Sequence, residues 1–245
     1  MATNRKKKTN TAGSTKKPSG SKPASVQQKT DTKKSAAGGK RSDARIADTN
    51  SHPARTAATV ELAENVFLHP ASVVEGLVHI GRCSSVWGGA VIRADMNTIR
   101  LGEYVNIQDN STLHVDTRSS ISVGDYSLIA HNVMLHGCHI GRACMIGIGS
   151  IILDGAEVGD GAMITAGCLI RGGKKIPPGA MVINKGGELK IVPGAAKTIM
   201  TVMGSLEYVL LAERFVRQQF GPLTADDVRA LEGEAREVLR RFGLK

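Results

Sequence analysis

Aromatic side chains are scarce in this sequence, and their scarcity limits what the interior can be made of. Phe, Tyr and Trp together account for 3% of the residues, whereas glycine occurs 28 times. The hydrophobic core must therefore be built from Val, Ile, Leu, Met and Ala. Many small residues and few rings favour an architecture in which thin layers of backbone stack closely on one another.

Cysteines are also few, and their spacing excludes two kinds of site. None of them forms a CxxC pair; they are Cys83, Cys138, Cys144 and Cys168. This spacing predicts neither a disulfide framework nor a zinc–thiolate site. We expect free thiols, which fit a reducing compartment.

Long apolar runs are absent as well. No run reaches the roughly 18–20 residues of a membrane span, so no transmembrane segment is predicted. The first residues have a charged start but no apolar segment behind it, which does not resemble a secretory signal. We expect a cytoplasmic location, with the mitochondrial matrix as the alternative, because the basic N-terminal region lacks large apolar residues for an amphipathic presequence.

Acidic residues are almost missing from residues 1–58. This segment holds 14 Lys and Arg against 3 Asp and Glu, while the remaining 187 residues hold 18 and 19. The net charge of +10 therefore belongs to the N-terminal segment, and it is no sign that the rest of the chain binds nucleic acid. Its low-complexity composition predicts a disordered basic tail. The tail could contact nucleic acid or an anionic surface; the alternative is a solvated extension without a specific partner.

From about residue 60 onwards, aliphatic side chains recur every six residues. The longest unbroken series consists of Ile140, Ile146, Ile152, Val158, Ile164, Ile170, Ile176 and Val182. Shorter series upstream keep the same step, and the phase slips by three residues near 96–99, by four near 117–120 and by minus one near Cys138. A period of six is typical of a hexapeptide repeat, in which three hexapeptides form one 18-residue coil of a parallel β-helix.

The predicted fold class is therefore all-β with C-terminal helices. We expect a left-handed parallel β-helix over residues 59–193 and a helical extension over 194–245. The extension contains a long helix within about 194–220, followed by a second, short helix over 224–242 that Thr224 can cap. In the long helix one apolar stripe is predicted, interrupted only by Glu213; it comprises Met200, Met203, Leu206, Val209, Leu210 and Val216.

The predicted 18-residue coil determines which histidines can lie side by side. Leu113 and Leu135 are one coil apart, so the residues that follow them, His114 and His136, should stack on the outside of neighbouring strands. Arg93 occupies the same position one coil earlier. His131 lies on the preceding side of the coil, near a corner and away from the other two histidines.

This placement predicts a metal site shared between subunits. One chain supplies two stacked imidazoles, and a third ligand could arrive from a neighbouring subunit, as in a closed cyclic homotrimer. Three neutral imidazoles suit Zn²⁺, with Fe²⁺ or Co²⁺ as further possibilities. Three protein ligands leave one position for water, whose pKa a bound metal lowers to roughly 7.

Polar residues also stand where the repeat would favour small ones. Arg93 and Asp95 follow Ile92, and Gln108 and Asp109 follow Ile107. Arg93 could pair with Asp109 or Asp95 across an interface, because a bidentate guanidinium–carboxylate contact fixes register. Gln108 could donate a hydrogen bond to a metal-bound hydroxide or a substrate oxygen. Structural ion pairs and hydrogen bonds are the alternative for all of these residues.

Residues 80–183 resemble the γ-class carbonic anhydrases, in particular the branch of small bacterial and mitochondrial relatives. The resemblance rests on the segments VIRADMNTIRLGEYVNIQDNSTLHVD (91–116) and SLIAHNVMLHGCHIGRACMIGIGSIILDGAEVGDGAMITAG (127–167). It implies reversible hydration of CO₂ to bicarbonate by a metal-bound hydroxide at the interfaces of a trimer. It further implies roles for seven residues: metal ligands His114, His131 and His136, an intersubunit ion pair of Arg93 with Asp109, water-orienting Gln108 and the active-site carboxylate Asp95.

The sequence departs from this family at the residues that move protons. Highly active members have a Glu directly after the RxD triplet and another in an acidic loop, whereas this chain has Met96 and no room for the loop after His114. A positioned acid–base group typically contributes 10²–10⁴-fold in rate. Two alternatives therefore stand beside the enzyme: a metal-stabilised structural or assembly subunit, and a hexapeptide-repeat acyltransferase, which would need no metal.

Overall fold

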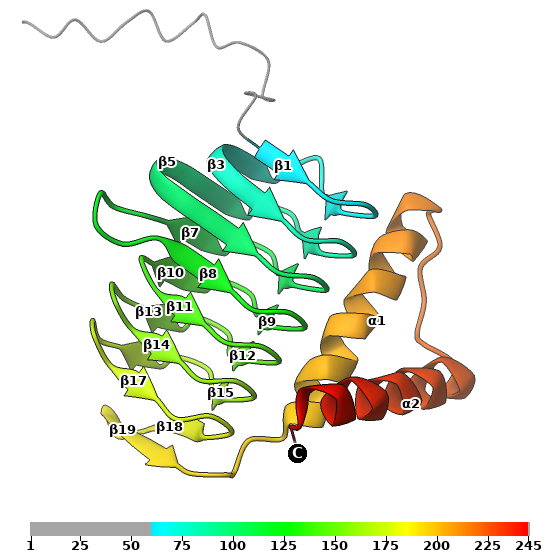
Figure 1. Ribbon diagram of the computed structural model, residues 1–245. Coiled ribbons are helices and arrows are strands. Elements are labelled where there is room, and N and C mark those ends of the chain that lie inside the picture. Colours follow the sequence, from blue (N-terminus) through cyan, green and yellow to red (C-terminus); the bar gives the residue numbers. More distant parts are fainter. Residues whose placement is uncertain (1–59, 245) are drawn as a thin grey trace, which may run out of the picture. The chain divides into compact units, whose positions relative to one another are not determined.

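The computed structural model of the protein describes residues 60–244. The predicted tail, residues 1–58, lies outside the described residues. The described chain forms a stack of short parallel strands followed by two helices (Figure 1). This confirms the predicted fold class, a hexapeptide-repeat β-helix with a helical C-terminal extension. The last strand ends at Val192 and the first helix begins at Thr198.

Two sheets enclose three sides of the β-helix, because one sheet turns a corner. Its long strands β3 (Val73–Ile80) and β5 (Val91–Leu101) change register between Gly76 and Val78, where residues 95–98 of β5 have no partner in β3. This bulge accounts for the three-residue slip in the phase of the repeat near residues 96–99. The halves of β3 and β5 before and after it belong to two different sides of the coil.

The first side is formed by the N-terminal halves of β3 and β5 and by four shorter strands that follow them in the stack. These strands are β7 (Thr112–His114), β10 (Met134–His136), β13 (Ile151–Ile152) and β16 (Leu169–Ile170). We call it the histidine side, since His114 and His136 end two of its strands.

The second side is a separate sheet, which the C-terminal helices cover. Its strands are β2 (Phe67–Leu68), β4 (Ser85–Val86), β6 (Asn106–Ile107), β9 (Leu128–Ile129), β12 (Met145–Ile146), β15 (Met163–Ile164), β18 (Met181–Lys185) and β19 (Glu188–Val192). β19 pairs antiparallel with β18 and closes the end of the stack.

The third side continues from the C-terminal halves of β3 and β5. Its other strands are β1 (Val60–Leu62), β8 (Ile121–Val123), β11 (His139–Ile140), β14 (Glu157–Val158) and β17 (Lys175–Ile176). All pairings except that of β18 with β19 are parallel, as expected for successive coils.

The six-residue series predicted from the sequence forms the interior. Every member from Ile80 to Val182 is buried, and most are fully inaccessible to solvent. Small residues at the corners let coils approach closely: a side-chain carbon at Gly81 would lie 2.4 Å from the carbonyl oxygen of Gly102 in the next coil. A narrow interior of this kind has no space for rings, which explains the low aromatic content.

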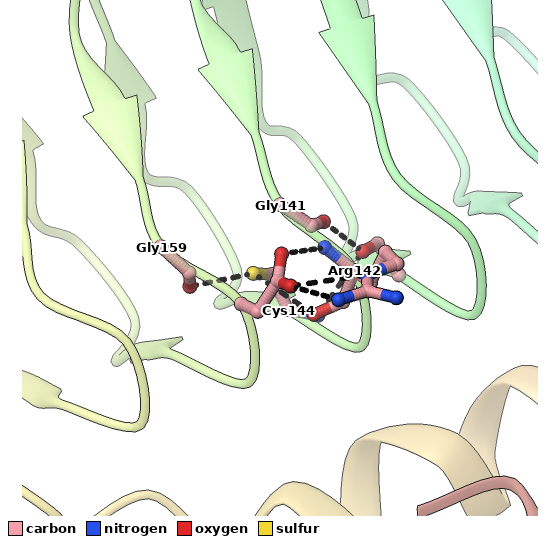
Figure 2. A network of polar contacts seen from close by, with 6 residues as sticks. Gly141, Arg142, Cys144 and Gly159 are labelled. Carbon is pink, nitrogen blue, oxygen red and sulfur yellow. Dashed lines mark hydrogen bonds and ion pairs between the residues drawn. The ribbon is translucent and has the colours of Figure 1, made fainter. Parts of the chain in front are cut away.

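Charged side chains join successive coils along one corner. Arg142 donates hydrogen bonds from its backbone amide and its guanidinium to Asp160, at distances of 2.6–3.0 Å, and the nearby Cys144 thiol contacts the carbonyl oxygen of Gly159 (Figure 2). Burial raises the pKa of Cys144 to about 12, so the thiol stays neutral. All four cysteines are free in the described chain, as expected from their spacing.

Helix α1 (Thr198–Val216) packs on the second side, through a buried face that shares only Leu206 with the predicted stripe. Met200 and Val216 are exposed, at 54% and 68%. The buried face is instead mostly small or short: Thr198, Thr201, Val202, Ser205, Leu206 and Ala212. A side-chain carbon at Gly204 would lie 2.8 Å from Leu128 of β9, so the helix needs small residues to approach the sheet.

Helix α2 (Ala225–Phe242) begins after Thr224, as predicted, and its 18 residues make it nearly as long as α1. The Thr224 hydroxyl accepts a hydrogen bond from the amide of Asp227, whose carboxylate accepts one from the Thr224 amide. Arg214 of α1 also pairs with Asp227 at 2.9 Å. In the described part of the chain, neither helix is long and apolar enough to cross a bilayer.

This capping box allows a test of how far α2 contributes to stability. Replacing Thr224 with alanine is expected to lower the free energy of unfolding by about 1 kcal/mol, the usual cost of losing a side-chain N-cap. Urea denaturation followed by circular dichroism measures it. The control is Thr117→Ala, an exposed loop threonine outside any helix; equal stability of the two variants would contradict the prediction.

Candidate metal centre

Two histidines stack on the outside of the histidine side, in the register that the sequence predicts. His114 of β7 pairs with His136 of β10, and Arg93 of β5 pairs with His114. The ring nitrogens His114 Nδ1 and His136 Nε2 face each other at 3.1 Å. Because a metal ion also binds to ring nitrogens, these two converge on one possible coordination position.

A carboxylate holds the other nitrogen of each ring. His114 Nε2 lies 3.1 Å from Asp95, and His136 Nδ1 lies 2.5 Å from Asp154. A carboxylate on the outer nitrogen fixes the orientation and tautomer of an imidazole and makes it a stronger metal ligand. The two facing nitrogens are thus the ones left free for a metal.

His131 is supported in the same way but stands elsewhere, as expected. It lies in the turn between β9 and β10, at the corner where the second side meets the histidine side, and its Nδ1 lies 3.2 Å from Asp109. No contact of its Nε2 with another residue is seen within residues 60–244. Within residues 60–244 of one chain, no three His, Cys, Asp or Glu residues are placed to hold a metal ion together.

Negative charge surrounds the stacked pair. Partial removal from water is the largest influence on Asp95 and raises its pKa, but hydrogen bonds with His114 and its own backbone, together with Arg93, outweigh it, so the pKa of Asp95 lies below its usual value. Hydrogen bonds from the amides of Arg118 and Ser119 lower the pKa of nearby Asp116. Ionised carboxylates beside a pair of imidazoles favour a bound cation.

The remaining sequence-predicted residues are divided between these two places. Arg93 forms its ion pair with Asp95 in the same chain, while Asp109 contacts His131. Gln108 lies beside Asp109 and is 5% exposed. Met96 is exposed at the bulge of β5 and offers no proton-accepting group.

Asp154 was missed by the sequence analysis. The signal was available, because Asp154 follows His136 by 18 residues, which is one coil. It was overlooked because it stands in an ordinary Asp-Gly turn of the repeat, where an Asp is expected for structural reasons.

The role of Asp154 can be tested through metal affinity. Replacing it with alanine is expected to weaken metal binding by roughly 10–100-fold, because His136 loses the carboxylate that orients it. Competition with a chromophoric chelator measures the affinity. Glu157→Ala is the matched control: this exposed carboxylate pairs with Lys175 on the third side. Equal affinities in both variants would show that Asp154 does not support the metal.

Comparison with known proteins places these features in a family context. A family model described as bacterial transferase hexapeptide (six repeats) matches residues 137–172. Gamma carbonic anhydrase 1, mitochondrial, from Arabidopsis thaliana is 42% identical over 96 residues, which cover 36% of this chain and 34% of that protein. The carbonic anhydrase of Geobacillus kaustophilus is 40% identical over 94 residues, covering 38% and 52%. The chain thus spans about a third to a half of the length of these curated relatives.

A solved structure extends the similarity over most of the β-helix. The crystal structure of a putative acetyltransferase from Bacillus cereus, the product of the BC4754 gene, superposes with a TM-score of 0.61 at 35% identity. The match covers 65% of this chain and 93% of that one. The fold, the repeat and the segment that contains the histidines therefore have relatives of known structure or curated name.

Proposed function

The chain belongs to the γ-class carbonic anhydrase family of hexapeptide-repeat proteins, and from this premise we propose that it hydrates CO₂ reversibly to bicarbonate at a metal centre shared between copies of the chain. One observation favours this function above others. Each of the three candidate ligands, His114, His131 and His136, has one ring nitrogen against a carboxylate, and in the stacked pair the two other nitrogens face each other at 3.1 Å.

The donor set fits a divalent metal. Neutral imidazoles backed by carboxylates are the ligands of catalytic zinc, and Fe²⁺ or Co²⁺ suits them as well. His114 and His136 would hold the ion from one chain and His131 from its neighbour. When bound, the metal would acidify water and so supply the nucleophile that attacks CO₂.

The chain's own residues would then orient the reactants. The buried side chain of Gln108 carries an amide that can donate a hydrogen bond to an oxygen of CO₂ or bicarbonate, and Asp109 beside it keeps His131 in place. Asp95 orients His114 and takes Arg93 as its counter-ion within the chain. In the trimer, Arg93 is proposed to exchange Asp95 for Asp109 of the adjacent copy, as in the family.

The homotrimer is supported by an apolar column on the histidine side. In register along the stack, and pointing outwards beside the histidines, lie Val91, Thr112, Met134, Ile151 and Leu169. Ile151 and Leu169 are among the exposed large hydrophobic residues. An exposed apolar strip next to an incomplete polar site is typical of a subunit interface. A copy packed there could bring its His131 corner to the stacked pair.

The structural or assembly subunit remains the second candidate, and Met96 favours it. Where fast members of the family have a proton-accepting Glu, this exposed thioether accepts no proton, so release of the proton to water should be slow. The acyltransferase alternative agrees with the similarity to the putative acetyltransferase of Bacillus cereus, but three carboxylate-supported histidines are not needed for acyl transfer. We propose a cytoplasmic location for the protein, with the mitochondrial matrix as the alternative.

Metal analysis together with stopped-flow CO₂ hydration tests the proposal. We expect about one metal ion per chain and a hydration rate above that of the metal-free protein. A fully metallated trimer without hydration activity would favour the structural subunit. A protein that binds no metal but transfers an acetyl group from acetyl-coenzyme A would overturn the proposal in favour of the acyltransferase.

A further inference from the structure

Positive charge is concentrated at one end of the described β-helix. Residues 169–197 form the last coil, the closing hairpin of β18 with β19 and the segment that leads into α1. They hold six Lys and Arg against one carboxylate, Glu188, whereas residues 59–245 as a whole hold 18 and 19. We call this surface the basic end, and its cations are Arg171, Lys174, Lys175, Lys185, Lys190 and Lys197.

These cations lie on the outside of the molecule. All six are exposed, and four of them stand in or directly beside β17, β18 and β19, the strands at the lower end of the stack in Figure 1. Lys175 forms an ion pair with Glu157 at 3.0 Å, and Glu188 stands opposite Lys185 in the hairpin. The other four cations form no ion pair within residues 60–244.

The other carboxylates of the preceding coil do not neutralise this surface. Asp154 contacts His136, and Asp160 is paired with Arg142 at 2.6 Å. The opposite end of the stack has the reverse charge, because residues 60–77 contain three Glu and neither Lys nor Arg. The β-helix therefore has a positive field at one end, although residues 59–245 are nearly neutral as a whole.

The composition of the basic end suits an anionic lipid surface better than a nucleic acid. Residues 169–197 contain no aromatic residue, so this segment offers no ring on which a base could stack. Five of the six cations are lysines, which act as point charges and lack the planar fork with which Arg recognises phosphates and bases. Clusters of this size and composition are attracted to membranes that contain anionic lipids.

The proposed trimer would bring three basic ends together. The apolar column on the histidine side runs along the stack, so neighbouring copies would pack side by side. A threefold axis parallel to the stacks keeps their direction, and the C-terminal ends of all three β-helices then lie on one face. A flat membrane can contact all three ends at once, whereas a rod-shaped nucleic-acid duplex meets fewer of them.

We propose that this face docks the trimer on a membrane surface rich in anionic lipid headgroups. The inference rests on the trimer of the proposed function and not on its catalysis. Electrostatic attraction is screened within about 8 Å at physiological ionic strength, so the basic end itself must contact the headgroups. The stacked histidines would stay clear of them, because β13 separates β10 from the last coil.

Sedimentation with lipid vesicles tests the docking. The full-length, metal-loaded protein is mixed with phosphatidylcholine vesicles that contain or lack phosphatidylglycerol, at physiological ionic strength. We expect binding to the anionic vesicles, a steep loss of this binding as salt is added, and no binding to pure phosphatidylcholine. Light scattering on the same preparation reports the trimer separately. A trimer that does not bind anionic vesicles would overturn the docking and leave the proposed function intact.

Two double variants locate the contact. Lys185→Gln with Lys190→Gln removes two charges per chain from the basic end. The control, Arg217→Gln with Arg229→Gln, removes as many exposed charges beside the junction of α1 and α2. The first should raise the lipid concentration for half-maximal binding at least about tenfold, and the control less than about twofold. Equal losses would assign the binding to net charge or to residues 1–58 and overturn the proposal, as would tighter binding to a DNA duplex than to the vesicles.

Discussion

Replacing His114 with alanine is expected to remove both the bound metal and the CO₂ hydration activity. His114 supplies one of the two imidazoles that stack within residues 60–244 of one chain, and its Nδ1 faces His136 at 3.1 Å. Loss of a ligand should weaken metal binding by more than the roughly 10–100-fold that loss of a supporting carboxylate costs. Elemental analysis after dialysis and stopped-flow CO₂ hydration measure the two effects.

His139 provides the matched control for this experiment. It is an exposed histidine on the third side, and its Nδ1 forms a hydrogen bond with the Ser122 hydroxyl at 2.9 Å. It takes no part in the proposed site. His139→Ala should keep metal and activity. If His114→Ala retained its metal and turned over CO₂ at the unaltered rate, the stacked pair would not be the metal site.

Introducing a glutamate at Ile151 is expected to separate the trimer into monomers and to release the metal, although all three histidines remain. Ile151 is in the middle of the apolar column, between Met134 and Leu169, and its side chain is exposed in the single chain. A carboxylate buried there without a partner should weaken association by roughly 10²–10³-fold. Light scattering coupled to gel filtration measures the mass, and elemental analysis measures the metal.

An exposed position on a different element separates this effect from a general one. Val228 of α2 is exposed to a similar degree, and Val228→Glu should remain trimeric and metallated. The fold of Ile151→Glu should survive, because the neighbouring Ile152 and not Ile151 faces the interior. A trimeric, metal-bound Ile151→Glu protein would place the subunit interface on another surface.

The sequence was sufficient to predict the stacking of the histidines, because register in a β-helix follows directly from spacing. The 22 residues between His114 and His136 are one coil and one four-residue slip, and the strands pair as this requires. The same spacing predicted Arg93 beside His114. The family resemblance inferred from residues 91–116 and 127–167 is likewise confirmed.

The helix that covers the sheet could not be oriented in this way. Hydropathy favoured a stripe with Met200 and Val216, yet the buried face contains Thr201 and Ser205. A helix that lies close to a sheet of short strands needs small residues at the contact, and some of them satisfy buried backbone groups, as Thr198 does for the carbonyl of Gly161. Hydropathy measures only transfer from water and is insensitive to this requirement.

Side-chain contacts between coils could not be predicted from the sequence either. Whether Arg93 pairs with Asp95 or Asp109 depends on rotamers and on what a second copy offers, and spacing fixes neither. The contact between the rings of Trp87 and Phe215 is a similar case: the two residues are 128 positions apart, and only the path of α1 along the stack brings them together. Long-range contacts of this kind have no periodic signal.

The route of α1 along the stack also has a consequence for the order of folding. Hydrogen bonds between neighbouring coils join residues 14 to 23 positions apart, whereas the bond from Ser205 to Tyr104 spans 101 positions and that from Arg241 to Tyr126 spans 115. Contacts between nearby residues close small loops and form early, and distant ones form late. On the ribosome, the coils can therefore stack one after another while the chain is still being made, and the helices close over a finished surface.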